Sequence, residues 1–251
     1  MKTKLIMESW RRFLKEEKER MKKIFVLVGP PSVGKSTWIK STFAEERPYV
    51  INRDELAEQV ASEYGWTYDD MFVNPGVIPP DGGKEIELED GTKQKKPYHS
   101  KYGFVEPAPA YMSWPGAPKQ VYSTVTEANG KVHSMHLARV AAAKDSGQDI
   151  VVDMTNMGAG ARKSALSAIK GVEDQYKKIA VDFKYPDAEI VAAIAEKRNQ
   201  EAKKQGRSKT ISLGLIKNMI SRYQPPTPEE GFDEIVSVDN TELLKRLAKE
   251  P

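Results

Sequence analysis

The chain has 251 residues, and its 39 Lys and Arg against 36 Asp and Glu give a formal net charge of +3. This length fits one α/β domain with an insertion, and the small net charge requires any polyanion site to be a local patch. The absence of cysteine excludes disulfides, thiolate metal sites and cysteine nucleophiles. No apolar run reaches the roughly 20 residues of a membrane span, so we expect a cytoplasmic protein with no membrane partner.

The first twenty residues precede the expected core and form a separate segment. Four apolar residues recur at helical spacing, and a charge run follows at 15–20. The stripe consists of Ile6, Trp10, Phe13 and Leu14. This pattern predicts an amphipathic helix over 1–20. It either docks on the core, extends as a solvated arm, or serves as a tag that binds a partner.

The apolar run 24–28 ends in a glycine-rich segment that opens a helix, which is the context of a phosphate-binding P-loop. Glycine-permitted turns aim successive N–H groups at phosphate oxygens, Lys35 can reach the β and γ phosphates, and Ser36 can hold Mg²⁺. The sequence therefore predicts a site for ATP and Mg²⁺. Its nucleotide-binding residues are Gly29, Pro30, Pro31, Ser32, Val33, Gly34, Lys35, Ser36 and Thr37.

A second short strand, 49–51, leads into Asn52, Arg53 and Asp54, and a helix is expected from Glu55 to Tyr64. Ligands of open parallel sheets bind outside the carboxyl ends of the strands, so a carboxylate at this place can take a proton from an attacking hydroxyl. Asp54 is our candidate general base. A cap for the helix that follows is the other interpretation, and the two roles are compatible.

Residues 73–131 form an irregular insertion. Their first part is rich in proline and glycine, which predicts loops and short strands and excludes a continuous helix or central strand. A flap over a substrate and a passive surface excursion both fit. The aromatic residues interleave with lysines, which is typical of a stacking platform for bases but also of a small satellite core with a lysine rim.

The remaining chain alternates helices with strands, which predicts a parallel sheet. The expected helices are 132–143, 161–172, 187–205 and 212–223, and a further helix closes the chain. The expected strands are 149–153, 178–183 and 232–238. We therefore predict an α/β fold of the P-loop NTPase type, with a parallel sheet flanked by helices, an N-terminal helical extension and the irregular insertion. One kinase-like domain covers 21–251.

Two further segments carry chemistry. The strand 149–153 runs into the turn 153–156, at the edge of the sheet where ligands bind. The segment 197–210 holds six cationic side chains beside Gly206, and we interpret it as a lid or as a solvated helix end. The cations are Lys197, Arg198, Lys203, Lys204, Arg207 and Lys209.

The order and spacing of these motifs resemble the kinase domain of phage polynucleotide 5′-hydroxyl kinases, within a wider set that includes zeta-toxin-like kinases. The matching residues are Gly34-Lys35-Ser36-Thr37-Trp38, Asn52-Arg53-Asp54, Asp153-Met154-Thr155-Asn156, Arg162-Lys163, and Arg198-Asn199 with Arg207. The resemblance implies ATP-dependent transfer of the γ-phosphate to a hydroxyl of DNA or RNA.

The same resemblance implies roles for individual residues. Asp54 corresponds to the general base, Lys35 and Ser36 to the ligands of phosphate and Mg²⁺, and Arg198 and Arg207 to lid arginines. Acceptor contacts are expected from the turn and from nearby arginines, namely from Arg53, Asp153, Thr155, Asn156 and Arg162. The phosphatase motif of bifunctional members is not found, so we expect no phosphatase activity.

One position departs from the family pattern. The arginine that grips the phosphate beside the acceptor hydroxyl is expected three residues after Asp54, where this chain has Ala57. Arg53, Arg162 or a lysine of the insertion can replace it, or the acceptor is different. Hydroxymethylated bases in phage DNA and nucleotide sugars are the alternative acceptors. An ATP-binding structural or capsid-associated protein, using residues 1–20 as a packaging tag, is the alternative without transferase activity.

Overall fold

The computed structural model describes residues 21–73, 83–99, 103–104, 119–205 and 209–249. The expected helix 1–20 and Arg207 lie outside these ranges. The chain folds into two compact units. The first comprises Met1–Ile51, Val140–Lys184 and Ser221–Asn240, and the second comprises Asn52–Arg139, Tyr185–Ile220 and Thr241–Pro251.

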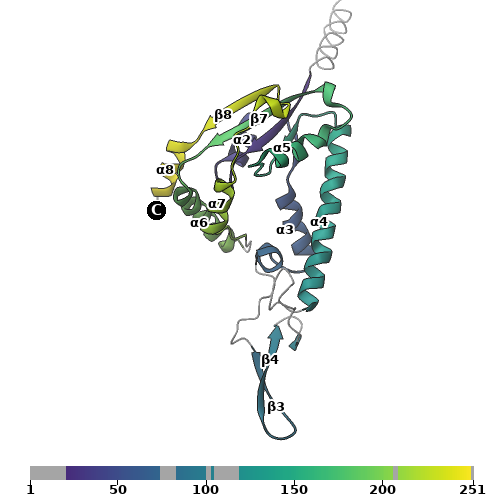
Figure 1. Ribbon diagram of the computed structural model, residues 1–251, viewed down its shortest axis with the longest axis vertical. Coiled ribbons are helices and arrows are strands. Elements are labelled where there is room, and N and C mark those ends of the chain that lie inside the picture. Colours follow the sequence, from purple (N-terminus) through teal and green to yellow (C-terminus); the bar gives the residue numbers. More distant parts are fainter. Residues whose placement is uncertain (1–20, 74–82, 100–102, 105–118, 206–208, 250–251) are drawn as a thin grey trace, which may run out of the picture. The chain divides into compact units, whose positions relative to one another are not determined.

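The first unit contains a five-stranded sheet in the order β2-β6-β1-β7-β8, and all of its neighbouring strands are parallel. In the central strand, Val26 pairs with Val152 of β6 and Ala180 of β7. This confirms the predicted P-loop NTPase-type α/β fold (Figure 1). The strands are β1 (Lys22–Val28), β2 (Tyr49–Ile51), β6 (Ile150–Val152), β7 (Tyr176–Lys184) and β8 (Glu234–Asp239).

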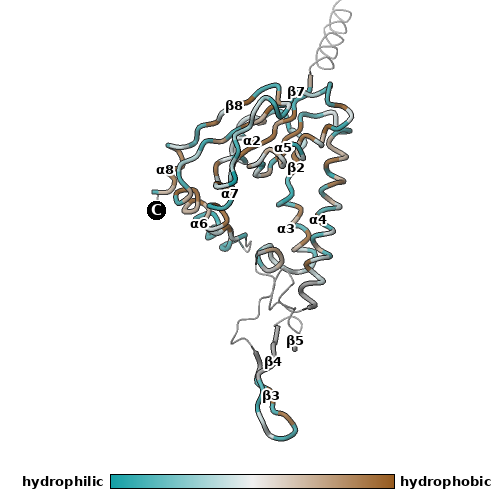
Figure 2. Tube along the Cα trace, in the orientation of Figure 1, coloured by the Kyte–Doolittle hydropathy of each residue, from teal (hydrophilic) through white to brown (hydrophobic). Residues whose placement is uncertain are grey.

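The core of this unit explains why its strands are continuous apolar runs. A strand that is covered on both faces does not alternate apolar with polar residues along its length. Ile24 and Val26 of β1 and Ile150 of β6 are completely buried. Helix α5 (Ala159–Leu166) packs on β1, with Ala165 in the same apolar cluster. Figure 2 shows hydrophobic colour concentrated in this part of the sheet. The edge strand β8 is mostly exposed.

The second unit is mainly helical. Helix α3 packs on α4 through buried apolar side chains that include Leu56, Val60, Val125 and Val132. Helix α6 packs on α8, where Lys197 Nζ donates to the carbonyl oxygens of Leu247 and Ala248, both at 3.1 Å. The helices are α3 (Arg53–Glu63), α4 (Lys119–Asp145, whose last turns belong to the first unit), α6 (Ala188–Lys204), α7 (Leu213–Ser221) and α8 (Thr241–Lys249).

The insertion is partly as predicted. Strands β3 (Gly83–Glu87) and β4 (Lys93–His99) form an antiparallel hairpin, and β4 also pairs with β5 (Gly103–Phe104). Helix α4, however, begins at Lys119 and not at residue 132, so the C-terminal end of the expected insertion is helical. The buried Val125, Ala128 and Val132 mark its apolar face. The Thr, Gly and Asn residues between them have low helix propensity, which obscured this pattern.

The other helix boundaries differ by smaller amounts. The helix expected over 161–172 is α5, which ends at Leu166 and continues as the 3₁₀ turn Ser167–Ile169.

In the part of the chain that the structure describes, no helix is long and apolar enough to cross a membrane.

Candidate functional site

The P-loop connects β1 to helix α2 (Lys35–Thr42) through a strained backbone. Ser32 has φ +67° and Gly34 has φ +99°, the left-handed conformation that lets a short loop turn its N–H groups inward. A Cβ atom on Gly34 would come within 2.8 Å of the side-chain nitrogen of Asn240. Glycine at this position is therefore required twice, by its backbone conformation and by the space around it.

The start of helix α2 supplies the donors that a phosphate needs. Gly34 caps this helix without a side-chain hydrogen bond, and Ser36 and Thr37 are exposed in its first turn. Helix N-termini of this kind bind anions through their N–H groups and their partial positive charge. A triphosphate therefore fits this loop, and the hydroxyl of Ser36 fits Mg²⁺ as an oxygen ligand.

Lys35 is held inside the loop. Its Nζ donates to the carbonyl oxygens of Gly29 at 2.9 Å and Pro30 at 2.8 Å. These bonds keep the ammonium beside the turn where the phosphates would lie. A bound phosphate must compete with these carbonyl oxygens for the same ammonium.

Aromatic packing fixes α2 on the sheet. The ring of Trp38 meets the edges or faces of three phenylalanines at centroid distances between 5.7 and 6.2 Å. Its partners are Phe25 of β1, Phe43 after α2, and Phe183 of β7. Trp38 therefore holds the phosphate-binding helix against the two central strands.

Asn240 also shapes the loop, and sequence reasoning did not identify it. Its Nδ2 donates to the carbonyl oxygen of Val33 at 2.7 Å, and its backbone N–H donates to Lys184. The residue lies directly after β8. The rule that ligand-site residues follow the carboxyl ends of strands could have found it.

The turn after β6 is joined to the base of the P-loop. Gly29 donates its N–H to the carbonyl oxygen of Thr155 at 2.9 Å, and Asn156 Nδ2 donates to that of Leu27 at 2.8 Å. The backbone N–H of Asp153 donates to Ile51 at the end of β2. The backbone of Asn156 is in the left-handed conformation, with φ +45°. Its side chain is buried and links strands of the sheet, so it does not face solvent.

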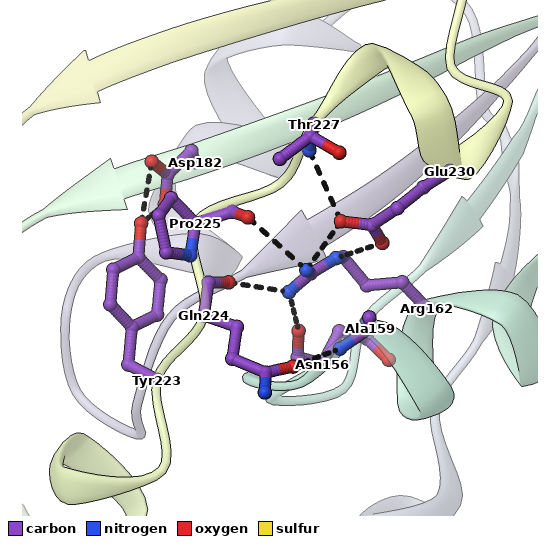
Figure 3. Close-up of polar contacts among 9 residues, drawn as sticks. All are labelled: Asn156, Ala159, Arg162, Asp182, Tyr223, Gln224, Pro225, Thr227 and Glu230. Carbon is purple, nitrogen blue, oxygen red and sulfur yellow. Dashed lines mark hydrogen bonds and ion pairs between the residues drawn. The ribbon is translucent and has the colours of Figure 1, made fainter.

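Arg162 has a structural role, which corrects the expectation that it contacts an acceptor. Its guanidinium is fully buried and makes two hydrogen bonds of 2.7 Å to the two carboxylate oxygens of Glu230. It also donates to the carbonyl oxygens of Asn156, Gln224 and Pro225, as Figure 3 shows. All of its donor groups are thus used within the protein, where they hold the loop after α7.

The carboxylate of Glu230 completes this closed network. The guanidinium of Arg162 lowers the pKa of Glu230, and the same carboxylate accepts the backbone N–H of Thr227 at 3.1 Å. A neighbouring buried carboxylate, Asp182 of β7, accepts the hydroxyl of Tyr223 (Figure 3). Glu230 and Asp182 were not identified from the sequence. A charged residue is unusual inside an apolar run such as that of β7, and this signal could have identified Asp182.

Asp54 lies in the second unit, at the start of α3. The helix is capped by Asn52, whose Oδ1 accepts the N–H groups of Asp54 at 2.9 Å and Glu55 at 3.3 Å. The expectation that Asp54 caps this helix is therefore wrong. Its carboxylate, 59% exposed, forms an ion pair of 2.8 Å with Lys209, and the neighbouring Arg53 is exposed.

The segment expected as a lid is largely regular helix. Helix α6 continues to Lys204, so the first eight residues of the segment 197–210 belong to it. Arg198 is exposed on this helix, although partial desolvation by the surrounding protein lowers the pKa of its guanidinium from the usual value. Arg207 lies outside the described residues, and its expected role stays a prediction.

The position that departs from the resemblance also has a structural explanation. Ala57 is 5% exposed and packs in the apolar cluster that joins α3 to α4. An arginine there would place its charge in this cluster, so the clamp of the polynucleotide kinases has no equivalent at this position.

The profile of a family described as an AAA domain matches residues 24–226, and no curated protein matches the chain. Three solved structures are similar at 12% identity. A toxin–antitoxin protein (PezAT) of Streptococcus pneumoniae has a TM-score of 0.48, with coverage of 93% of this chain and 75% of that chain. An inferred kinase from Chloroflexus aurantiacus has a TM-score of 0.45, with coverage of 92% of this chain and 94% of that chain. A gluconokinase from Sinorhizobium meliloti has a TM-score of 0.36, with coverage of 92% of this chain and 90% of that chain.

Proposed function

The chain belongs to this AAA domain family, and from its P-loop and its exposed Asp54 we propose that it is an ATP-dependent phosphotransferase acting on a hydroxyl. The proposed acceptor is the 5′-hydroxyl of a polynucleotide. P-loop families in general use ATP with Mg²⁺, and the residues of this loop suit both.

The observation that carries the proposal is a pair of features at the carboxyl ends of two strands. The P-loop with Lys35 and Ser36 follows β1, and Asp54 follows β2 by three residues. A motor or switch needs the first feature alone, whereas a kinase also needs a carboxylate that can accept the proton of a hydroxyl. Because Asn52 caps α3, the carboxylate of Asp54 is available for this task.

In the proposed reaction, each residue has a defined task. The P-loop N–H groups and Lys35 neutralise the β and γ phosphates, and Ser36 ligates Mg²⁺. Asp54 accepts the proton of the acceptor hydroxyl while the hydroxyl oxygen bonds to the γ-phosphorus, and ADP leaves. Arg198 and Arg207 bring cationic charge to the migrating group, where an arginine is effective because it does not deprotonate.

Two observations bear on the acceptor. Arg53 precedes Asp54 and is exposed, which suits a phosphate next to the reacting hydroxyl and supports a polynucleotide. Ala57 stands where the polynucleotide kinases have a phosphate-gripping arginine, and the internal use of Arg162 removes one candidate replacement. This favours a small hydroxyl acceptor as the second candidate.

The test is transfer of labelled γ-phosphate from ATP to a panel of acceptors. The panel contains 5′-hydroxyl DNA, 5′-hydroxyl RNA, DNA with hydroxymethyluracil, gluconate and nucleotide sugars. We expect labelled 5′ ends, and we expect no label with Lys35→Met. The matched control, Lys40→Met, changes an exposed lysine in the last turn of the same helix and should transfer at the wild-type rate.

Each other outcome has a definite meaning. Label on a small acceptor with none on either oligonucleotide replaces the polynucleotide with the second candidate. ATP binding without transfer to any hydroxyl overturns the phosphotransferase and favours a protein that uses ATP only as a switch. Retained transfer by Lys35→Met would overturn the assignment of the phosphate site.

A further inference from the structure

The chain at Lys209 and directly after it is anchored within the second unit. Thr210 donates its backbone N–H and its hydroxyl to the carboxylate of Asp69, both at 2.6 Å. The amide of Asn199, buried in α6, lies between the carbonyl oxygen of Lys209 and the N–H of Ile211, so we assign its nitrogen as donor to the first and its oxygen as acceptor from the second, at 3.2 Å. Two buried side chains from different elements therefore fix the backbone that carries Lys209.

The side chain of Lys209 is directed to α3. Its Nζ lies 2.8 Å from Asp54 Oδ2 and 3.7 Å from Glu58 Oε1, and 5.1 Å from the centre of the Tyr68 ring. A cation over an aromatic face is attracted to it, and burial raises the pKa of Tyr68 to about 12, so this ring stays uncharged. The ammonium thus has three partners, and its side chain is 26% exposed.

This arrangement differs from an ordinary surface ion pair. The pair of Lys217 with Glu189, at 2.7 Å, has side chains 52% and 60% exposed. Such pairs contribute little, because two long side chains must be ordered in water for a screened attraction. The anchored backbone and the aromatic ring already restrict Lys209, so less freedom is lost when it holds a carboxylate.

We propose that Lys209 is a positioning residue for Asp54, on the proposed function that Asp54 is the general base. Lys209 binds Oδ2 and thereby sets the orientation of the carboxylate. Oδ1 is then the oxygen that accepts the proton of the acceptor hydroxyl, while the oxygen–phosphorus bond forms and the bond from the γ-phosphorus to the β-phosphate oxygen breaks. A base held in one orientation reacts faster than one that samples several.

The first experiment compares Lys209→Met and Lys209→Arg with Lys217→Met as the matched control, using the acceptor that the panel identifies. We expect Lys209→Met to lower kcat by about tenfold to a hundredfold, below the usual contribution of a general base itself, with KM for ATP within about twofold. Lys209→Arg keeps the charge and should recover part of the rate. Lys217→Met should match the wild type.

The second experiment is a double-mutant cycle with Asp54→Asn. If Lys209 acts through Asp54, then Lys209→Met produces no further loss in the Asp54→Asn background. An equal loss in both backgrounds, or a full rate for Lys209→Met, overturns this role and leaves the phosphotransferase intact. Absence of transfer by the wild-type protein overturns the proposed function instead, and the positioning role with it.

Discussion

Two ion pairs of nearly equal length have opposite surroundings. Arg162 and Glu230 in the first unit are 2.7 Å apart, and Lys209 and Asp54 in the second are 2.8 Å apart. The side chains of the first pair are 0% and 16% exposed, against 26% and 59% for the second. Distance therefore does not distinguish a structural pair from one available for chemistry. Burial and the number of internal partners do.

The partners of each cation make the same point. Arg162 donates to one carboxylate and three backbone carbonyl groups, so nothing of its guanidinium is left for a ligand. Asp54 gives one oxygen to Lys209 and remains largely exposed. The first arrangement holds a loop, and the second suits proton transfer.

The largest effect on stability is expected from Arg162→Met. It leaves the carboxylate of Glu230 and three carbonyl oxygens without their donor, and breaking a buried pair from one side typically costs about 3–5 kcal/mol. Denaturant unfolding should show this loss in the free energy of unfolding. The double variant Arg162→Met/Glu230→Gln, which removes the unpaired charge, should recover part of it. A loss below about 1 kcal/mol would mean that the two pairs are not different in kind.

The largest effect on activity is expected from Asp54→Asn. We predict that kcat falls by about a hundredfold to ten-thousandfold, the range of a general base, because the amide cannot accept the proton. The free energy of unfolding should change by less than about 1 kcal/mol, since the side chain of Asp54 is 59% exposed and water can replace the contact that its charge loses. Both kcat and the free energy of unfolding should be measured on the same preparation. We expect a large loss of kcat with little loss of stability, whereas Arg162→Met is defined by its loss of stability. Near-normal turnover would show that Asp54 is not the base.

The fold was predictable because its signals are local. The strands of a doubly covered parallel sheet are short apolar runs, and the P-loop sequence carries its own turn and helix start. Helix α4 was the main error. Its first half buries Val125 and Ala128 against α3, a partner far away in the sequence, and its intrinsic helix propensity is weak.

For the candidate site, the sequence could bring together only residues that are neighbours in the chain. The P-loop and the Asn52–Asp54 segment are local motifs. Glu230 meets Arg162 across 68 residues, and Asn240 meets Val33 across 207, so these contacts depend on the folded sheet. Arg162 was assigned to the acceptor because its position matches a motif, and a motif does not reveal burial. Lys209 was one of six cations until the structure distinguished it by its anchors.

A smaller effect is expected from Asn240→Ala, which tests whether a structural contact can act on the nucleotide. Losing one hydrogen bond to the Val33 carbonyl is worth about 1 kcal/mol, so KM for ATP should rise about fivefold with kcat nearly unchanged. Asn129→Ala is the matched control, because Asn129 Nδ2 donates to the Val125 carbonyl oxygen at 3.0 Å within α4. A similar KM for both variants would remove Asn240 from the site.

The smallest effect is the pH dependence of stability, which we expect from the buried pair of Arg162 and Glu230 and not from an exposed pair. Arg162 lowers the pKa of Glu230, so the folded protein binds this proton less readily than the unfolded chain. The stabilisation from Glu230 is complete above the ordinary glutamate pKa of about 4.3 and is lost as pH falls through the lowered value. The free energy of unfolding should therefore begin to decrease as the pH falls through about 4.3 and should decrease further below it. Glu230→Gln should flatten this decrease, whereas Glu242→Gln, in the exposed pair with Lys245, should leave it unchanged. Equal slopes in both variants would place the acid sensitivity elsewhere and weaken the distinction between the buried pair and the exposed one.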